Sequence, residues 1–312
     1  MPIYELSDTG LVPFQRLNPG PDLYESEIEA LVWDDLEAFT GMVLFPVARQ
    51  PKISAGGIPD VLALDKSGCV VIIEVKRDID RGQLAQCLEY AGWARTTSLD
   101  EIASLYNRNA DGHAGQQAFF SDWQEFTETS TPVVISASPS LVLIARDFHG
   151  RTRSALEFLQ QNSVPVTVIP VTLYQDDLGR KIVDIDADHE PPAPVASALA
   201  PSTTAKAPYK TKDASGRRVT VKDLIDIGSL TANEPVEFRR PKLGEVHHAT
   251  ILLDGRFQLA DGTIWNSPSR AAVVAADVVA QDGWESWLVV RTGKKLHQHR
   301  EEAVDESFVD AS

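Results

Sequence analysis

The amino-acid sequence predicts an α/β fold, a mixed sheet flanked by helices, followed by a small α+β C-terminal domain. Apolar strand-like runs alternate with helical segments, and the strands are apolar on both faces, as in sheets that helices cover on both sides. A Pro/Ala/Ser/Thr-rich stretch divides the chain and predicts an extended linker. The expected segments are a first domain (1–186), a linker (187–216), a second domain (217–300) and an acidic tail (301–312) that we expect to fray.

Each element of the first domain follows from its hydrophobic spacing. Apolar residues at helical intervals predict helices, and short apolar runs predict strands. Lys66-Ser67-Gly68 separates two such runs and predicts a β-hairpin. In chain order we expect a helix at 24–39, a strand at 42–50, hairpin strands at 58–65 and 69–76, a helix at 83–96, a strand at 140–148, a helix at 152–162 and a strand at 164–176.

The second domain shows turn signals between short alternating runs. Two Asp-Gly pairs interrupt residues 248–267 and predict a β-meander. Ser267 as N-cap and Pro268 as first helical residue predict a helix. The expected elements are a short strand and a helix over 217–230, the meander at 248–267, a helix at 268–280 and a strand at 284–291.

Length and charge suggest two domains of different character. The chain has 312 residues and a net charge of -16, and this length is typical of about two domains. Residues 1–205 carry a net charge of -15, residues 206–300 carry +4, and the tail carries -5. The overall acidity argues against a nucleic-acid partner, whereas the basic balance of residues 206–300 is suited to one.

The sequence shows no sign of export or of a membrane span. No apolar run approaches the ~18 residues that a span needs, and the N-terminus lacks the basic start and apolar core of a secretory signal. Cys69 and Cys87 are too few for a disulfide framework or a Cys-based zinc site, and we expect both to be small buried apolar side chains. We therefore expect a soluble, cytoplasmic protein with no membrane partner.

The hairpin is expected to bring three charged residues together. With a three-residue loop and Gly68 in the left-handed conformation, Asp60 lies across from Glu74, and strand alternation returns Lys76 to the same face. Two close carboxylates repel unless a cation lies between them, and oxygen ligands favour Mg²⁺, for which Mn²⁺ may substitute in experiments. Such a metal polarises a phosphate and activates water, and Lys76 would assist. The predicted chemistry is hydrolysis of a phosphodiester bond.

The same three residues also have a purely structural interpretation. An Asp at the start of a strand and a Glu-x-Lys at the end of one are common patterns. The uninterrupted apolar run at 70–73 favours the functional interpretation, because it places Glu74 and Lys76 at the end of an interior strand. Charged side chains are seldom buried there without a partner or a use.

The segment GGIPDVLALDKSGCVVIIEVKR, preceded by an acidic helix and followed by QLAQCLEYAGW, resembles the PD-(D/E)xK nuclease superfamily. It is most similar to the RecB-like and NucS/EndoMS-type nuclease domains, over roughly residues 20–178. The resemblance implies a restriction-endonuclease-like fold. It also implies that Asp60 and Glu74 bind the metal and that Lys76 is catalytic.

The same resemblance implies two supporting residues. A Glu of the N-terminal helix is expected near the metal, and we match it to Glu27, with Glu25 and Glu29 as alternatives. A Gln of the following helix is matched by Gln86 in preference to Gln83. Glu27 and Gln86 are equally well explained as solvated residues of amphipathic helices. Candidates for phosphate contact, with a solvated surface role as the alternative, are Arg77, Lys52, Arg49 and Arg81.

The segments KDLIDIGSL, DGRFQLADGTIWNSPSRAAVVAA and DGWESWLVV are similar to the RAMA domain, the restriction enzyme and adenine methylase associated module. The resemblance implies an accessory role in recognising DNA, modified bases included. Trp265 and Trp284 are candidates for stacking on a base, and Ser267 and Ser269 for binding phosphate at a helix N-terminus. Alternatively, the tryptophans form a small core and Ser267 is merely a cap; we favour the core for Trp287 and leave Trp284 open.

Together these patterns predict a Mg²⁺-dependent DNA endonuclease with a C-terminal specificity module, acting in restriction of foreign or modified DNA or in repair. The alternatives are a non-catalytic DNA-binding protein or modification reader that uses the nuclease fold as a scaffold, and an RNA-directed nuclease. Double-strand cleavage ordinarily needs two active sites, so a homodimer is also expected. His297 and His299 are not accompanied by a further ligand, and we expect them at a solvated C-terminal end.

Overall fold

The computed structural model describes most of the chain, in segments separated by short gaps. These segments are residues 3–7, 10–17, 21–79, 81–109, 116–129, 135–136, 138–148, 150–161, 164–186 and 210–310. Residues 187–209 of the predicted linker therefore lie outside the described residues. None of the helices in the described segments is long and apolar enough to cross a membrane.

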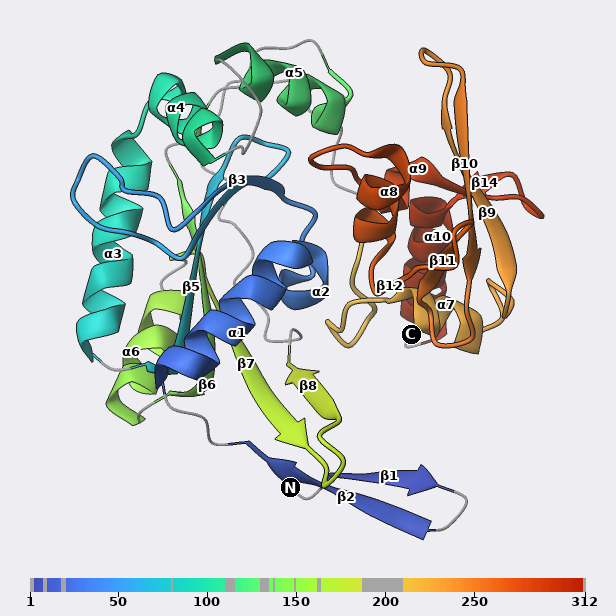
Figure 1. Ribbon diagram of the computed structural model, residues 1–312, viewed down its shortest axis with the longest axis horizontal. Helices are drawn as coiled ribbons and strands as arrows, with labels where there is room; N and C mark the ends of the chain where they lie inside the picture. The colour runs from blue at the N-terminus through green and yellow to red at the C-terminus, as the bar shows by residue number, and fades with distance from the viewer. Residues whose placement is uncertain are drawn as a thin grey trace.

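The first domain is built on a mixed sheet, which confirms the predicted α/β class (Figure 1). Its strands are β1 (Ile3–Ser7), β2 (Gly10–Arg16), β3 (Phe45–Arg49), β4 (Val61–Leu64), β5 (Val70–Ile79), β6 (Ser140–Phe148), β7 (Val166–Gln175) and β8 (Lys181–Ile185). They are ordered β1-β2-β7-β6-β5-β4-β3, and β8 pairs with β7 outside this path. β5, β6 and β7 run parallel, whereas the other neighbours are antiparallel.

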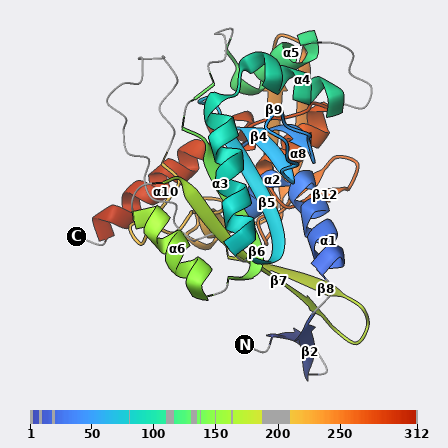
Figure 2. The same cartoon turned by 90° about the vertical axis from the view of Figure 1, so that its left-hand side faces the viewer.

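Helices cover both faces of this sheet, as predicted (Figure 2). They are α1 (Pro21–Asp34), α2 (Leu36–Thr40), α3 (Arg81–Thr96), α4 (Leu99–Asn109), α5 (Gln116–Thr127) and α6 (Gly150–Gln161). The apolar residues of α1 and α2 pack with the odd-numbered side chains of β4 and β5, such as Val61 and Ile73. Those of α3 to α6 pack with the even-numbered side chains, such as Leu62 and Ile72. Strand alternation thus gives the domain two apolar layers.

The second domain holds an antiparallel sheet with helices packed on it. Its elements are α7 (Val221–Asp226), β9 (Glu234–Arg240), β10 (Glu245–Ile251), β11 (Phe257–Leu259), β12 (Ile264–Trp265), α8 (Pro268–Ala276), α9 (Gly283–Ser286), β13 (Trp287–Val289), β14 (Lys294–Lys295) and α10 (Leu296–Asp310). The predicted meander corresponds to β10, β11 and β12. Ser267 caps α8, as predicted, and Trp287 is fully buried in the core, as we favoured.

The C-terminal end of the chain differs from the prediction. The acidic tail continues α10 as far as Asp310 instead of fraying, because Val304 is buried in the core of the second domain. His297 and His299 are buried rather than solvated. The His299 ring lies between the hydroxyl groups of Ser229 and Thr292, 2.9 Å from each.

Three other boundaries also differ. The predicted helix at 24–39 is interrupted at Asp35, whose carboxylate accepts a bond from the Ala38 amide and begins α2. Residues 284–286 form α9 rather than a strand, because Asp282 caps their backbone N–H groups. The last residues of the predicted linker are structured, since Lys212 forms a β-bridge with Arg218. The sequence interpretation did not include β1, β2, β8, β9, β14, α4, α5, α9 and α10.

Candidate active site

The β4–β5 hairpin has the predicted register. Gly68 adopts a φ of 82°, and Val61 pairs with Ile73, so that Asp60 comes opposite Glu74. The Asp60 backbone N–H donates to the Glu74 carboxylate at 3.3 Å. Because β5 lies between β4 and β6, Glu74 stands on an interior strand, as expected.

Asp60, Glu74 and Lys76 meet in one group, which we call the acid cluster. The Lys76 ammonium lies 3.1 Å from an Asp60 carboxylate oxygen and 3.1 Å from a Glu74 carboxylate oxygen. It also donates to the Val75 carbonyl at 2.9 Å, and the Val75 N–H donates to Asp60 at 2.7 Å. Three oxygen atoms from side chains and backbone therefore converge on one positive charge.

Burial perturbs the protonation of the acid cluster. The Glu74 side chain is 3% exposed, and burial together with repulsion from Asp60 raises the pKa of Glu74 to about 7. Burial also raises the pKa of Asp60, although Lys76 opposes this. Burial lowers the pKa of Lys76, but the Glu74 and Asp60 charges more than offset it, so that the net pKa is raised. Near neutral pH the cluster combines a charged amine with a carboxyl group that exchanges protons readily.

Helix α3 supports the loop before Asp60. The Gln86 amide donates to the Tyr90 hydroxyl group, which in turn accepts a bond from the Ile58 backbone N–H at 3.2 Å. The Tyr90 ring lies so close to Gly57 that a Cβ there would meet it at 2.5 Å. Gln86 therefore contacts Tyr90 and is a positioning residue for this loop.

Helix α1 brings Glu25, and not Glu27, to the acid cluster. The Glu25 carboxylate lies 3.8 Å from the Lys76 ammonium and accepts the Arg77 backbone N–H at 3.1 Å. Glu27 instead pairs with Lys181 of β8 at 2.8 Å. The match of Glu27 to a position beside the cluster is therefore wrong, and the alternative Glu25 replaces it.

Glu29, the other alternative, contacts residues outside the acid cluster. It is buried, and it accepts bonds from Arg49 at 2.6 Å and from the Gln50 side chain at 2.8 Å. Arg49, a candidate for phosphate contact, is thus ion-paired within the protein. Lys52 is exposed on the loop before Asp60, and Arg77 is half-buried next to the cluster.

Both cysteines behave as apolar side chains. Cys87 is fully buried in the core and Cys69 is half-buried. Burial raises the pKa of each thiol to about 12. Both therefore stay protonated near neutral pH and are poor nucleophiles.

The donor atoms of the acid cluster suit a hard divalent cation. Mg²⁺ prefers oxygen ligands, usually binds through one or two carboxylates and keeps several water ligands. Asp60 and Glu74 supply two carboxylates, and Val75 supplies a carbonyl oxygen. In the described part of the chain no group of three or more His, Cys, Asp or Glu side chains is arranged to hold a metal ion. The residues that would hold a metal in the acid cluster are Asp60 and Glu74, with water as the remaining ligands.

Three of the residues expected to contact nucleic acid in the second domain are buried against the first domain. The Ser267 hydroxyl donates to Asp35 at 2.8 Å, and the Ser269 backbone N–H donates to Glu37 at 3.2 Å. The Trp284 indole N–H also donates to Glu37, and Trp284 is 2% exposed. The expectation that these groups face DNA is therefore wrong for this conformation. Trp284, which we left open, belongs to the core.

Comparison with known families identifies the second domain. Residues 201–307 match the model of the family described as Restriction Enzyme Adenine Methylase Associated. We call this part of the chain the RAMA domain, after the family whose model it matches. The match confirms the resemblance drawn from the sequence, and it associates the protein with restriction–modification systems. No curated protein matches the chain.

Within the RAMA domain, Trp265 remains the most accessible of the predicted base-stacking residues. It is half-buried, and the Arg270 guanidinium lies 5.2 Å from its ring centre. The Trp265 indole N–H donates to the Thr263 hydroxyl at 3.1 Å. An aromatic ring beside a cation is a pairing that nucleic-acid-binding proteins use for stacking on bases.

Sequence reasoning missed the acidic side of the contact between the domains. Asp35 and Glu37 appeared as ordinary residues of one long helix, WDDLEAF. The signal that could have drawn attention to them is the run of three acids within four residues, beside a domain whose candidate contacts are hydrogen-bond donors.

Proposed function

We propose that this chain is a metal-dependent DNA endonuclease, in which the first domain has a restriction-endonuclease-like fold and cuts, and the RAMA domain selects the DNA. The acid cluster carries this proposal, because the Lys76 ammonium of interior strand β5 lies 3.1 Å from the Asp60 carboxylate and 3.1 Å from the Glu74 carboxylate. Burying charges costs free energy that an apolar core would avoid. Buried ionisable groups with perturbed pKa values are typical of catalytic sites.

The side chains suggest a division of labour. Asp60 and Glu74 would hold Mg²⁺, and the ion, when bound, would polarise the scissile phosphate and lower the pKa of a water molecule. Lys76 stays charged at neutral pH because its pKa is raised, and it orients the attacking water or offsets negative charge on the phosphate. Glu25 holds the end of β5 through the Arg77 amide, and Gln86 positions the loop before Asp60.

The family match bears on the setting and the substrate. Its association with restriction enzymes and adenine methylases favours foreign or modified DNA as the target, with repair as the second setting. The net charge of +4 on residues 206–300 favours contact with an anionic polymer. For double-strand cleavage, a homodimer would supply the second active site.

Cleavage of matched plasmids tests this function. One plasmid is unmodified, one carries methylated adenine and one carries modified cytosine, and each is incubated with Mg²⁺ or with EDTA. We expect strand breaks in at least one plasmid with Mg²⁺, and none with EDTA. Equal cleavage by the Asp60→Asn variant, or cleavage that persists in EDTA, would show that the acid cluster is not the nuclease site.

A second candidate is a non-catalytic reader of DNA that uses the first domain as a scaffold. One observation favours it, because the Lys76 ammonium contacts both carboxylates and offsets part of their negative charge. Calorimetric titration with Mn²⁺ near neutral pH separates the candidates. Heat that disappears in the Asp60→Asn variant supports the nuclease, whereas no binding to the wild-type protein supports the scaffold.

A further inference from the structure

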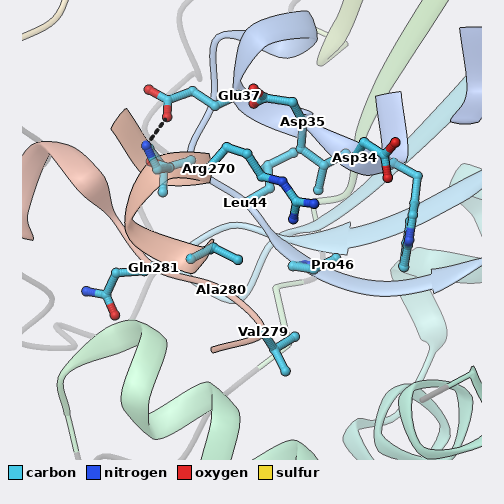
Figure 3. Close-up of a pocket in the computed structure, with 14 residues that line it drawn as sticks. Asp34, Asp35, Glu37, Leu44, Pro46, Arg270, Val279, Ala280 and Gln281 are labelled. Atoms are coloured by element: carbon cyan, nitrogen blue, oxygen red, sulfur yellow. Dashed lines mark hydrogen bonds between the residues drawn. The ribbon is translucent and has the colours of Figure 1, made fainter. Parts of the chain in front are cut away.

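The contact between the two domains joins acids of α2 to hydrogen-bond donors of the RAMA domain. Asp35 accepts the Ser267 hydroxyl, and Glu37 accepts both the Ser269 backbone N–H and the Trp284 indole N–H. Figure 3 shows Asp35 and Glu37 at the edge of a pocket that both domains line, with the hydrogen bond from Glu37 to the first turn of α8. The pocket has a volume of about 60 Å³, and a second pocket of about 400 Å³ is lined by Glu37, Ser267 and Trp284.

The surroundings of Glu37 are those that suit a phosphate oxygen. Its carboxylate receives one backbone N–H and one indole N–H, and the positive charge of Arg300 acts on it. The Arg300 guanidinium itself lies over the Trp284 ring. Backbone N–H groups, helix N-termini and arginines are donors through which proteins hold DNA phosphates, and the indole N–H of tryptophan can also donate a hydrogen bond. Glu37 therefore occupies a set of donors that fits an external anion equally well.

Burying the Asp35 and Glu37 carboxylates between the two domains costs free energy. Burial raises the pKa of Glu37, although Ser269, Arg300 and Trp284 oppose it, and burial raises the pKa of Asp35 as well. Taking a carboxylate out of water is unfavourable even when it is well paired. A DNA duplex, which presents many phosphates that each carry one negative charge, can therefore compete for the same donors.

We propose that α2 acts as an internal competitor of DNA, with Asp35 and Glu37 occupying the groups of the RAMA domain that would bind a DNA phosphate. This inference rests on the proposed DNA-binding function. In the docked form Ser267, Ser269 and Trp284 are closed to DNA, and binding of a duplex through them displaces α2. Docking and DNA binding at this face are mutually exclusive.

Hydrogen–deuterium exchange of the full-length protein tests the competition without any substitution. The probe is a short unmodified DNA duplex at saturating concentration, in EDTA so that no strand is cut. We expect DNA to accelerate exchange in residues 36–41, because they leave the contact, while residues 269–272 of α8 stay protected by the phosphate that replaces Glu37. Unchanged exchange in residues 36–41 on saturation with DNA would overturn the proposal.

A pair of variants adds an affinity readout. Glu37→Gln keeps the shape of the side chain and removes its charge, and we expect it to bind DNA about tenfold more tightly, which corresponds to about 1.4 kcal/mol. The matched control is Asp34→Asn, which removes the same charge from an exposed residue at the rim of the same pocket. Its affinity should stay within about twofold of wild type, since solvent and salt screen the charge of an exposed side chain.

The outcomes separate the competition from the proposed function. Equal DNA affinity of wild type, Glu37→Gln and Asp34→Asn would refute the competition while leaving DNA binding intact. Equal gains in both variants would assign the effect to net charge and also refute it. If neither wild type nor Glu37→Gln bound DNA, the proposed function would fail and this inference with it. Circular dichroism of each variant confirms that it is folded before affinity is measured.

Discussion

Replacing Lys76 with Met removes the positive charge that faces two buried carboxylates. The ammonium lies 3.1 Å from Asp60 and 3.1 Å from Glu74. With an effective dielectric constant of about 20, each contact is worth roughly 5 kcal/mol before the desolvation of the charges is subtracted. Removing one partner of a buried ion pair costs about 3–5 kcal/mol in practice. We expect Lys76→Met to lower the free energy of unfolding of the first domain by that amount near pH 8.

Urea-induced unfolding followed by far-UV circular dichroism measures this loss. The matched control is Lys181→Met, because Lys181 pairs with Glu27 on the surface, where both side chains are about one third to one half exposed. Such an exposed pair contributes less than about 1 kcal/mol. A loss below about 1 kcal/mol in Lys76→Met, similar to the control, would refute the reasoning that the cluster depends on this charge.

The same variant connects stability to metal binding. Without the ammonium, Asp60 and Glu74 repel each other, and a divalent cation would relieve the repulsion. At a Mn²⁺ concentration about a hundredfold above Kd, binding to the folded state adds about 2.7 kcal/mol. We therefore expect Mn²⁺ to restore much of the stability of Lys76→Met. Failure of Mn²⁺ to stabilise the variant would argue against a metal site formed by these carboxylates.

Three further predictions concern other positions. The raised pKa of Glu74 favours its protonated form in the folded state, so the free energy of unfolding should fall as pH rises from about 4.5 to about 7. Urea unfolding at a series of pH values should show this fall. The Glu74→Gln variant should show a smaller fall over the same pH range. Glu25→Gln should slow metal-dependent cleavage by about tenfold or more, whereas the cleavage rate of Glu27→Gln should stay within about twofold of wild type. Single-turnover assays measure both rates. A larger loss in Glu27→Gln than in Glu25→Gln would restore Glu27 as the site residue. Trp287→Ala should cost about 3–5 kcal/mol, because the ring is fully buried; a calorimetric scan should show the loss in the transition of the RAMA domain.

The acid cluster could be predicted because its geometry is local. A three-residue loop with a left-handed Gly68 sets the register of the hairpin, and the register alone places Asp60 opposite Glu74. Strand alternation then assigns Lys76 to the same face. Interactions between residues a few positions apart on one hairpin need no knowledge of the rest of the fold.

The predictions that were wrong concern residues whose positions depend on contacts between distant segments of the chain. Glu25 and Glu27 lie two positions apart on α1 and so point in different directions, and which of them reaches β5 depends on how the helix packs on the sheet. His299 was expected at a solvated end because no further metal ligand accompanies it in the sequence, whereas its ring lies between the hydroxyl groups of Ser229 and Thr292.

In the RAMA domain, too, the sequence predicts local features but not contacts with distant segments. Its local pattern correctly predicts the N-cap of α8 and the burial of Trp287. It does not reveal that Ser267 and Trp284 meet acids more than 200 residues earlier in the chain, because that contact depends on how two domains dock.

Cleavage of plasmid DNA by the wild-type protein and by Asp60→Asn, side by side in Mg²⁺, tests the central claim most directly. Asp60 accepts bonds from Val75 and Lys76, and Asn retains the oxygen that accepts them, so the variant should remain folded by circular dichroism. The account predicts strand breaks by wild type that require Mg²⁺, and loss of cleavage in the folded variant. Cleavage by Asp60→Asn at the wild-type rate would contradict the assignment of the acid cluster as the catalytic site.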